Sequence, residues 1–219
     1  MSLFHHSPPP EPERHLPFFK LWDAFVPGEC PVCHLVATHR AQMIATLFEE
    51  NVNDVGTRMH LHRSLGFSPG VAEQIGGSQD ALGISIIYRS LCQDVVERLA
   101  QAHPHLKPEE PCLVLEAERR DEERVCDEFA LHYVATDFQE RHAQSFGLCA
   151  GHLAQVLHRM AEGEAKERLR EVEREKFAAL AQQLDLYLDK SRYDNRQEMG
   201  AEKTAWDAAQ RKLRRPEPR

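Results

Sequence analysis

Residues 30–33 read Cys-Pro-Val-Cys, and residues 149–152, more than a hundred positions further along the chain, read Cys-Ala-Gly-His. Each stretch is spaced so that its two metal-ligating side chains can bind the same ion. Zinc accepts three thiolates and one imidazole in a tetrahedral shell, with ligands from separate chain segments. The sequence therefore predicts one metal site that joins two distant stretches of chain. Its expected ligands are Cys30, Cys33, Cys149 and His152.

Helical periodicity dominates the sequence around both stretches. Pro31 suits the first turn of a helix, because its missing N–H has no helical partner there. This helix is expected to run to about residue 50, with Ile44, Leu47 and Phe48 on one apolar face. Another is expected from Ser78 or Asp80, as its capping residue, to about residue 102. Further helices are expected at about residues 57–65, 112–136 and 137–143, and from residue 149 onwards. Since no strong strand signal is present, the chain is predicted to be all-α.

The last quarter of the chain is dense in charge. Acidic and basic side chains such as Glu162 and Lys166 stand at helical spacing. A final helix around Trp206 is expected to fold back on the body, and the basic residues 211–215 are expected to form a solvated tail. An apolar stripe on the preceding helix is expected to be buried, formed by Phe177, Leu180, Leu184 and Leu188.

Two stretches of the first half recur in the second half. Residues 28–33 match residues 110–115, 82 positions later, and residues 65–71 match residues 146–152, 81 positions later. Such a repeat predicts duplicated helical units related by pseudo-twofold symmetry. The predicted parts are a disordered Pro-rich segment at 1–16, repeat 1 at 17–102, a linker at 103–108, repeat 2 at 109–160 and a charged helical extension at 161–219.

The paired motifs resemble those of an uncharacterised bacterial family that has two copies of a Cys-Pro-x-Cys … Gly-Phe/Leu-Cys-x-x-His unit. The likeness covers roughly residues 20–212. It implies a fold and no reaction, because the family has no assigned activity. Outside the ligand stretches it is carried by residues 50–54, 81–84, 190–196 and 200–206.

This chain departs from the family pattern in both halves. Ser68 and Val71 stand where the pattern has Cys and His, and Leu115 stands where it has a second Cys. If each metal were held within one repeat, both sites would be half lost. Suppose instead that the front pair of one repeat, Cys-x-x-Cys, meets the rear pair of the other, Cys-x-x-His. Then one site is complete and the second is almost entirely lost. We therefore expect a single site across the repeats, with Cys112 as a remnant of the lost one.

Two functional hypotheses follow from this ligand set. Four protein ligands close a tetrahedral shell and leave no place for a substrate water, so a structural zinc ion in a non-catalytic adaptor or interaction module is expected first. Its protein partner and its oligomeric state are unknown. The alternative is an iron–sulfur or thiol redox protein, because cysteine-rich sites also serve those purposes. Residues 30–34 also spell a c-type haem attachment motif, which requires export.

Composition limits the other classes of function. A net charge of −8 over 219 residues argues against broad binding to nucleic acid or to anionic membranes. The densest apolar stretch, residues 82–88, is too short to span a bilayer. No secretion signal is visible, so a reducing cytoplasm is expected, where six cysteines suggest metal or redox use. Of the remaining cysteines, Cys92 is expected in the core and Cys126 on a helix.

Overall fold

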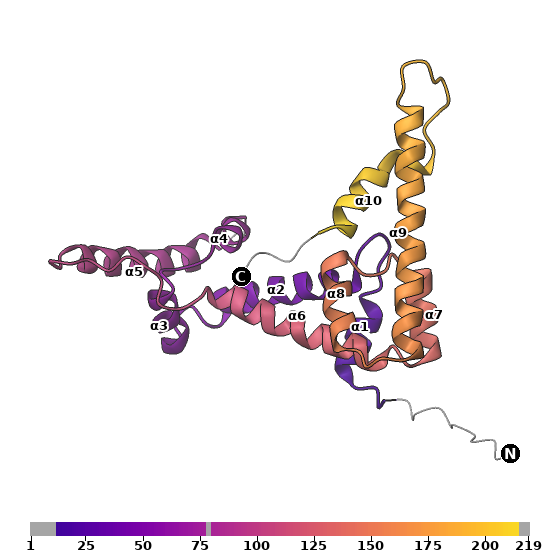
Figure 1. Ribbon diagram of the computed structural model, residues 1–219. Helices are drawn as coiled ribbons and strands as arrows, with labels where there is room; N and C mark the ends of the chain where they lie inside the picture. The colour runs from indigo at the N-terminus through magenta and orange to yellow at the C-terminus, as the bar shows by residue number, and fades with distance from the viewer. Residues whose placement is uncertain (1–11, 78–79, 215–219) are drawn as a thin grey trace, which may run out of the picture. The chain divides into compact units, whose positions relative to one another are not determined.

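The structure, a computed structural model, describes residues 12–77 and 80–214. Ten α-helices and one 3₁₀ helix make up the regular structure of these residues, and no strand occurs among them (Figure 1). The predicted all-α class is confirmed. Within the same residues, no helix is both long enough and apolar enough to cross a membrane. Residues 1–11, most of the segment predicted to be disordered, lie outside the described residues.

The chain divides into two compact units. Unit 1 comprises residues 1–35 and 124–219, and unit 2 comprises residues 36–123. Two long helices, α2 (Pro31–Glu49) and α6 (Leu113–His132), each contribute residues to both units. These units are defined by contacts in space. The predicted repeats, linker and extension concern duplication in the sequence, and their boundaries stay predictions.

Unit 1 contains the start of α2, the end of α6 and most of the other helices. Its α10 turns back along the chain and packs against α9, as the sequence predicts for the terminal helix (Figure 1). The helices that belong wholly to unit 1 are α1 (Leu16–Asp23), α7 (Thr136–Gln144), α8 (Ala150–Arg159), α9 (Glu164–Lys190), the 3₁₀ helix η1 (Ala201–Thr204) and α10 (Ala205–Lys212).

Aromatic side chains form the core of unit 1. The ring of Phe129 lies 5.7 Å from that of Tyr133 and 5.1 Å from that of Phe138, the latter edge to face. Phe18 of α1 lies 6.0 Å from Phe138. All four rings are fully buried. Burial of such large rings dominates core energetics, and their edge-to-face contacts add stability. These rings therefore join α1, the end of α6 and α7.

Unit 2 contains the rest of α2 and α6 and the helices between them, α3 (Val55–Arg63), α4 (Pro69–Gly76) and α5 (Ala81–Leu99). The predicted buried face of α2 is confirmed. Its residues belong to a core that consists of Ile44, Leu47, Phe48, Val52, Leu61, Val71, Ile75, Ile87, Leu91 and Val114.

Helix α4 is not among the helices that the sequence predicts. It has eight residues, too few for a helical period to stand out. Its start nevertheless carries a local signal, because Ser68 occupies the N-cap and Pro69 follows it. Val71 and Ile75, one turn apart, face the core and are buried. Tertiary burial thus stabilises a helix that would be marginal by itself.

Two predictions of burial are wrong. Cys92, expected in the core, is exposed on α5, although its neighbour Leu91 is buried. Leu188, expected to end a buried stripe on α9, is 64% exposed. The fully buried residues of α9 lie nearer its start and include Leu169 and Glu173. Apolar spacing therefore continues along α9 beyond the part that other segments cover.

The order of helices in the first half recurs in the second half. α6, α7 and α8 begin 82, 81 and 81 residues after α2, α3 and α4. Ser68 and Cys149, which the sequence aligns, are the N-cap residues of α4 and α8. The predicted duplication would produce this recurrence. The pseudo-symmetric relation of the two halves stays a prediction.

Asp80 caps helix α5, since its Oδ1 accepts a hydrogen bond from the N–H of Gly83 at 2.9 Å. We expect Asp80→Ala to lower the free energy of unfolding by about 1 kcal/mol, measured by chemical denaturation. Ser68 provides a matched control, because it occupies an N-cap but its side chain bonds no helix N–H. Ser68→Ala should change the same free energy by less than about 0.5 kcal/mol. Equal losses from both variants would contradict the capping role of Asp80.

Candidate metal centre

The front pair of predicted ligands lies at the start of α2. Cys30 directly precedes the first helical residue, Pro31, and its carbonyl accepts the N–H of His34 at 2.9 Å. Cys33 follows on the first turn of the helix. Cys30 is buried and Cys33 is partly buried. The local fold that the sequence predicts for this pair, a helix start with proline in its first turn, is confirmed.

The rear pair lies at the start of α8. Cys149 is the N-cap residue, and its carbonyl accepts the N–H of Leu153 at 2.8 Å. His152 lies in the first turn, and both ligands of this pair are buried. The turn that leads into the helix contains Gly147 at φ +82°, a backbone conformation that glycine adopts without strain.

The four side chains meet in unit 1, as the cross-repeat arrangement requires. Nδ1 of His152 lies 3.5 Å from Sγ of Cys30, 3.3 Å from Sγ of Cys33 and 3.2 Å from Sγ of Cys149. The Sγ atoms of Cys33 and Cys149 are 3.7 Å apart. All four ligand atoms lie within 4.8 Å of one another. They form a compact group that could hold a metal ion.

These distances fit a tetrahedral shell around one ion. Zinc binds sulfur at about 2.3 Å and nitrogen at about 2.0 Å, which places two sulfurs about 3.8 Å apart and a sulfur about 3.5 Å from the nitrogen. The sulfur–sulfur distance above agrees with this geometry. The three sulfur–nitrogen distances are equal to it or slightly shorter. The donor set, three thiols and one imidazole, has the chemistry that zinc prefers.

The thiols of the group interact with one another and with His152, and these contacts shift their pKa values in opposite directions. Hydrogen bonds with the thiols of Cys30 and Cys33, and a further one with His152, hold the pKa of Cys149 well below its usual range, although burial opposes the charge. The hydrogen bond between Cys33 and Cys149 is the main reason why the pKa of Cys33 is raised, and burial adds to it. Cys149 also lies at the N-cap of α8. The free N–H groups and the dipole of α8 stabilise a thiolate there.

A buried charged network lies beside the rear pair. The carboxylate of Glu173 accepts the N–H of Leu148 at 2.5 Å and lies 2.8 Å from Nε2 of His142. Its other oxygen lies 2.7 Å from Nζ of Lys212. The hydroxyl of Tyr133 lies 3.2 Å from the remaining ring nitrogen of His142. The side chains of Tyr133, His142, Glu173 and Lys212 are all almost completely buried.

The pKa shifts within this network define its protonation. Burial alone would raise the pKa of Glu173, but the hydrogen bond from His142 and the charge of Lys212 outweigh it and lower the pKa. For His142, burial lowers the pKa, and this effect exceeds the opposite effect of the Glu173 carboxylate. His142 is therefore neutral. Its Nε2–H donates to the Glu173 carboxylate, and its Nδ1 accepts the hydroxyl proton of Tyr133.

Lys212 corrects the expectation of a solvated basic tail at residues 211–215. This residue is 1% exposed and is ion-paired with Glu173, whereas the sequence shows only a run of basic residues. Its partner, Glu173, stands in a dense run of charges on α9, so nothing in the sequence indicated that Glu173 is buried either. Residue 215 lies outside the described residues. Sequence reasoning missed this network, because no local pattern distinguishes a buried charge from a solvated one.

The counterparts of the ligands in the other half lie in unit 2 and have apolar surroundings. Val71, aligned with His152, is fully buried in the unit 2 core. Cys112 and Leu115 pack against the same core. Across the described residues, one group of three or more His, Cys, Asp or Glu side chains is close enough to share an ion. It consists of Cys30, Cys33, Cys149 and His152. That a second site was lost stays a prediction.

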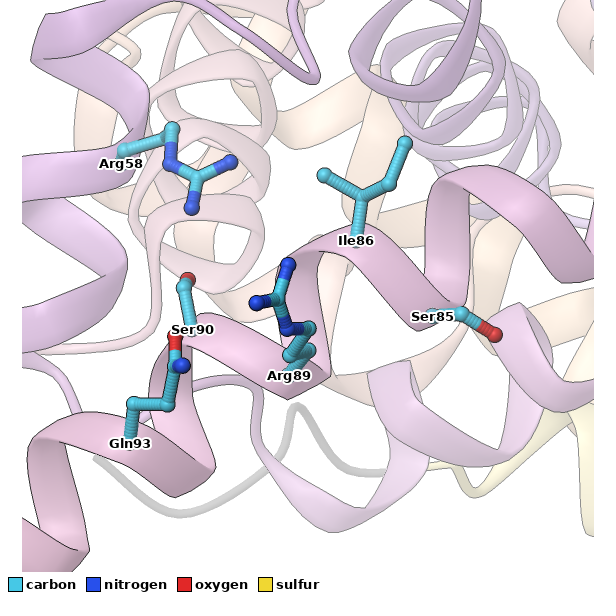
Figure 2. Close-up of a pocket in the computed structure, with 6 residues that line it drawn as sticks. All are labelled: Arg58, Ser85, Ile86, Arg89, Ser90 and Gln93. Carbon is cyan, nitrogen blue, oxygen red and sulfur yellow. The ribbon is translucent and has the colours of Figure 1, made fainter.

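Unit 2 also contains an open hollow of about 290 Å³ between α3 and α5 (Figure 2). Guanidinium, hydroxyl, amide and alkyl groups line it, and no thiol, imidazole or carboxylate does. Two guanidinium groups disfavour a metal cation, so this lining does not suit a metal ion. The lining residues are Arg58, Ser85, Ile86, Arg89, Ser90 and Gln93.

Comparisons with known proteins add a distant relative. No family model and no solved structure matches the chain. The chain is similar to a protein of Caldicellulosiruptor sp. (strain Rt8B.4) described as an uncharacterized 23.9 kDa protein in xynA 3′ region. The two are 26% identical over 179 residues, which represent 78% of this chain and 86% of that protein. This similarity supports an uncharacterised family, while the duplicated cysteine motifs stay a prediction.

Proposed function

We propose that this protein binds one zinc ion through Cys30, Cys33, Cys149 and His152, and that the ion stabilises a helical adaptor or interaction module. The observation that carries the proposal is the convergence of three sulfurs and one imidazole nitrogen within 4.8 Å. A structural zinc site supplies folding free energy directly, because no preformed site exists in the unfolded chain. Here it would tie the start of α2 to the start of α8.

The ligand spacing favours a single ion over an iron–sulfur cluster. The ligands of a cluster are divided between different irons, so at least some of them would have to stand further apart than four ligands that share one ion; here all four ligand atoms lie within 4.8 Å of one another. The Cys33–Cys149 sulfur distance of 3.7 Å agrees with the edge of a tetrahedron around one ion. Four protein ligands also leave no open position for a substrate water, which supports a structural role. A reducing cytoplasm would keep all three thiols available.

A role in protein interaction is supported by apolar side chains that remain exposed near the C-terminal end of unit 1. Covering large apolar side chains that are in contact with water is energetically favourable. Their partner would be another protein, because the acidic chain disfavours nucleic acid and anionic lipid. The exposed side chains of α9, α10 and the adjoining residues are Leu186, Leu188, Tyr193, Trp206 and Leu213.

Metal analysis and an absorption spectrum test this proposal. The chain, purified under reducing conditions without a His tag or chelator, is expected to be colourless and to contain about one zinc ion. Elemental analysis and the visible spectrum are the measurements. Iron together with a broad band near ~400 nm would instead support the iron–sulfur alternative. Protein with neither metal, even after anaerobic reconstitution with zinc or with iron and sulfide, would refute both.

A further inference from the structure

Charged side chains of α9 and α10 hold the backbone that leads into Cys149. The N–H of Leu148, the residue before Cys149, donates to Glu173 of α9 at 2.5 Å. The carbonyl of Phe146 accepts Nζ of Lys212 at 3.0 Å. The ligand-bearing turn is thus bound through its own N–H and carbonyl groups, and not only through its side chains.

A third charged group holds the beginning of the same turn. Nζ of Lys176 on α9 donates to the carbonyls of Ala143 and Ser145 at 2.7 and 2.6 Å. The approach is so close that a Cβ at Gly147 would lie 2.5 Å from Glu173 and 2.8 Å from Nζ of Lys212. Glycine is therefore required where the charged groups cross the turn.

Lys212 is the last residue of α10, and its position depends on how that helix docks. Its ammonium lies 2.7 Å from the Glu173 carboxylate and 4.9 Å from the ring centroid of Phe177. An ion pair in this buried environment resists solvent screening. Loss of one partner leaves an uncompensated buried charge, which is strongly unfavourable. Docking of α10 and the ionised state of Glu173 therefore depend on each other.

The same helix also approaches the front ligand pair. A Cβ at Gly28, two residues before Cys30, would lie 3.6 Å from a guanidinium nitrogen of Arg211. Arg211 and Lys212 are consecutive residues, so the end of α10 lies near both ligand-bearing turns. The far end of the segment is fastened separately, since Lys190 of α9 pairs with buried Glu202 of η1 at 2.9 Å.

We propose that α10 is a strap whose docking and metal binding at the Cys3His site stabilise each other, with Glu173 and Lys212 as the positioning residues. This inference rests on the proposed zinc function and adds a form of regulation to it. Glu173 positions Cys149 through the Leu148 N–H, and Lys212 keeps Glu173 charged and in place. Coupling between two sites is reciprocal: the factor by which strap release weakens zinc binding equals the factor by which zinc loss weakens docking.

Lys212→Met is the central variant, because it removes the ammonium and keeps a long apolar side chain. Loss of a group that orients a metal ligand typically weakens metal binding by about 10- to 100-fold. We therefore expect zinc to dissociate from full-length Lys212→Met at least about tenfold faster than from the native chain. The measurement is the rate of zinc transfer to a coloured chelator. Glu173→Gln should give a similar increase.

Lys166→Met is the matched control. Lys166 is a partly buried lysine of α9 that, like Lys212, is ion-paired, here with Glu162 at 2.7 Å, but it does not touch the turn that carries Cys149. Its substitution should leave the rate of zinc transfer unchanged. A spectroscopic measurement separates positioning from general stability: the d–d bands of the cobalt-substituted protein should shift in Lys212→Met and Glu173→Gln, and should not shift in Lys166→Met.

Hydrogen exchange of the native chain requires no variant to fold. Amide exchange in α10, residues 205–212, should be slower with zinc than without it, while α5 in unit 2 exchanges equally in both states. If the native chain binds no zinc, the proposed function itself fails. If it binds zinc, but Lys212→Met and Glu173→Gln release it as slowly as Lys166→Met does, the strap proposal is wrong. An amide exchange rate in α10 that is the same with and without zinc would also refute the strap proposal.

Discussion

The Cys149→Ser variant is expected to retain almost no zinc under conditions in which the native chain contains about one ion. Serine has nearly the same size, but its hydroxyl does not ionise at neutral pH and is a poor zinc ligand. Cys149 is also the N-cap residue of α8, where free N–H groups stabilise a thiolate. Its loss removes one of the four donors and breaks the link between the two helix starts.

Thermal unfolding gives a second measurement of the same variant. A ligand present at 100 to 1,000 times its Kd stabilises the folded state by about 3–4 kcal/mol. At such zinc concentrations, the free energy of unfolding of the native protein should therefore exceed that of Cys149→Ser by at least about 3 kcal/mol. The variant should also show no further change when zinc is added. Unchanged zinc stoichiometry and affinity in Cys149→Ser would refute a site shared between the two stretches.

Cys92→Ser is the control for this experiment. It makes the same chemical change at an exposed cysteine of α5, in unit 2. Zinc content and thermal stability should match those of the native chain. Loss of zinc in both variants would show that the cysteines act through a general effect, such as oxidation during purification.

Removal of the metal is expected to affect unit 1 far more than unit 2. All four predicted ligands belong to unit 1, whereas unit 2 has an apolar core that contains none of them. Treatment with a strong chelator should therefore accelerate amide exchange in the first turns of α2 and α8 and in the turn at residues 145–149. An ion held at 100 times its Kd suppresses opening about 100-fold, which sets the expected change in rate.

Mass spectrometry of peptides after exchange provides the measurement. Peptides from α3 and α5 should exchange at the same rate before and after chelation. The Cys149→Ser variant, which has no metal to lose, should be insensitive to the chelator throughout. Equal acceleration in the two units would contradict a local role for the ion, and so would no acceleration anywhere.

Much of the fold could be predicted from local sequence patterns. Proline in the first turn indicated the start of α2, and the spacing of Ile44, Leu47 and Phe48 indicated its buried face. The failures occurred where burial depends on distant neighbours. Cys92 and Leu188 have apolar neighbours at helical spacing, but no other segment covers them. Helix α4 was missed because eight residues contain too little of a period.

The candidate site divides in the same way. Its four metal-ligating residues were evident in the sequence, because chelation requires particular donor types at short spacings and those spacings survive in a linear chain. The complementary losses at Ser68, Val71 and Leu115 then indicated which pair meets which. The supporting residues were not evident. Glu173 and Lys212 lie 39 positions apart, each within a run of ordinary surface charges.

The sequence by itself determined the all-α class, the starts of α2 and α8 and the set of side chains that could share an ion. Only the tertiary structure decided that Lys212 is buried against Glu173 and that both hold the turn before Cys149. The reason is physical. Helical period and ligand spacing are properties of neighbouring residues, whereas the burial of a charge depends on whether an opposite charge from a distant segment reaches the same place in the folded chain.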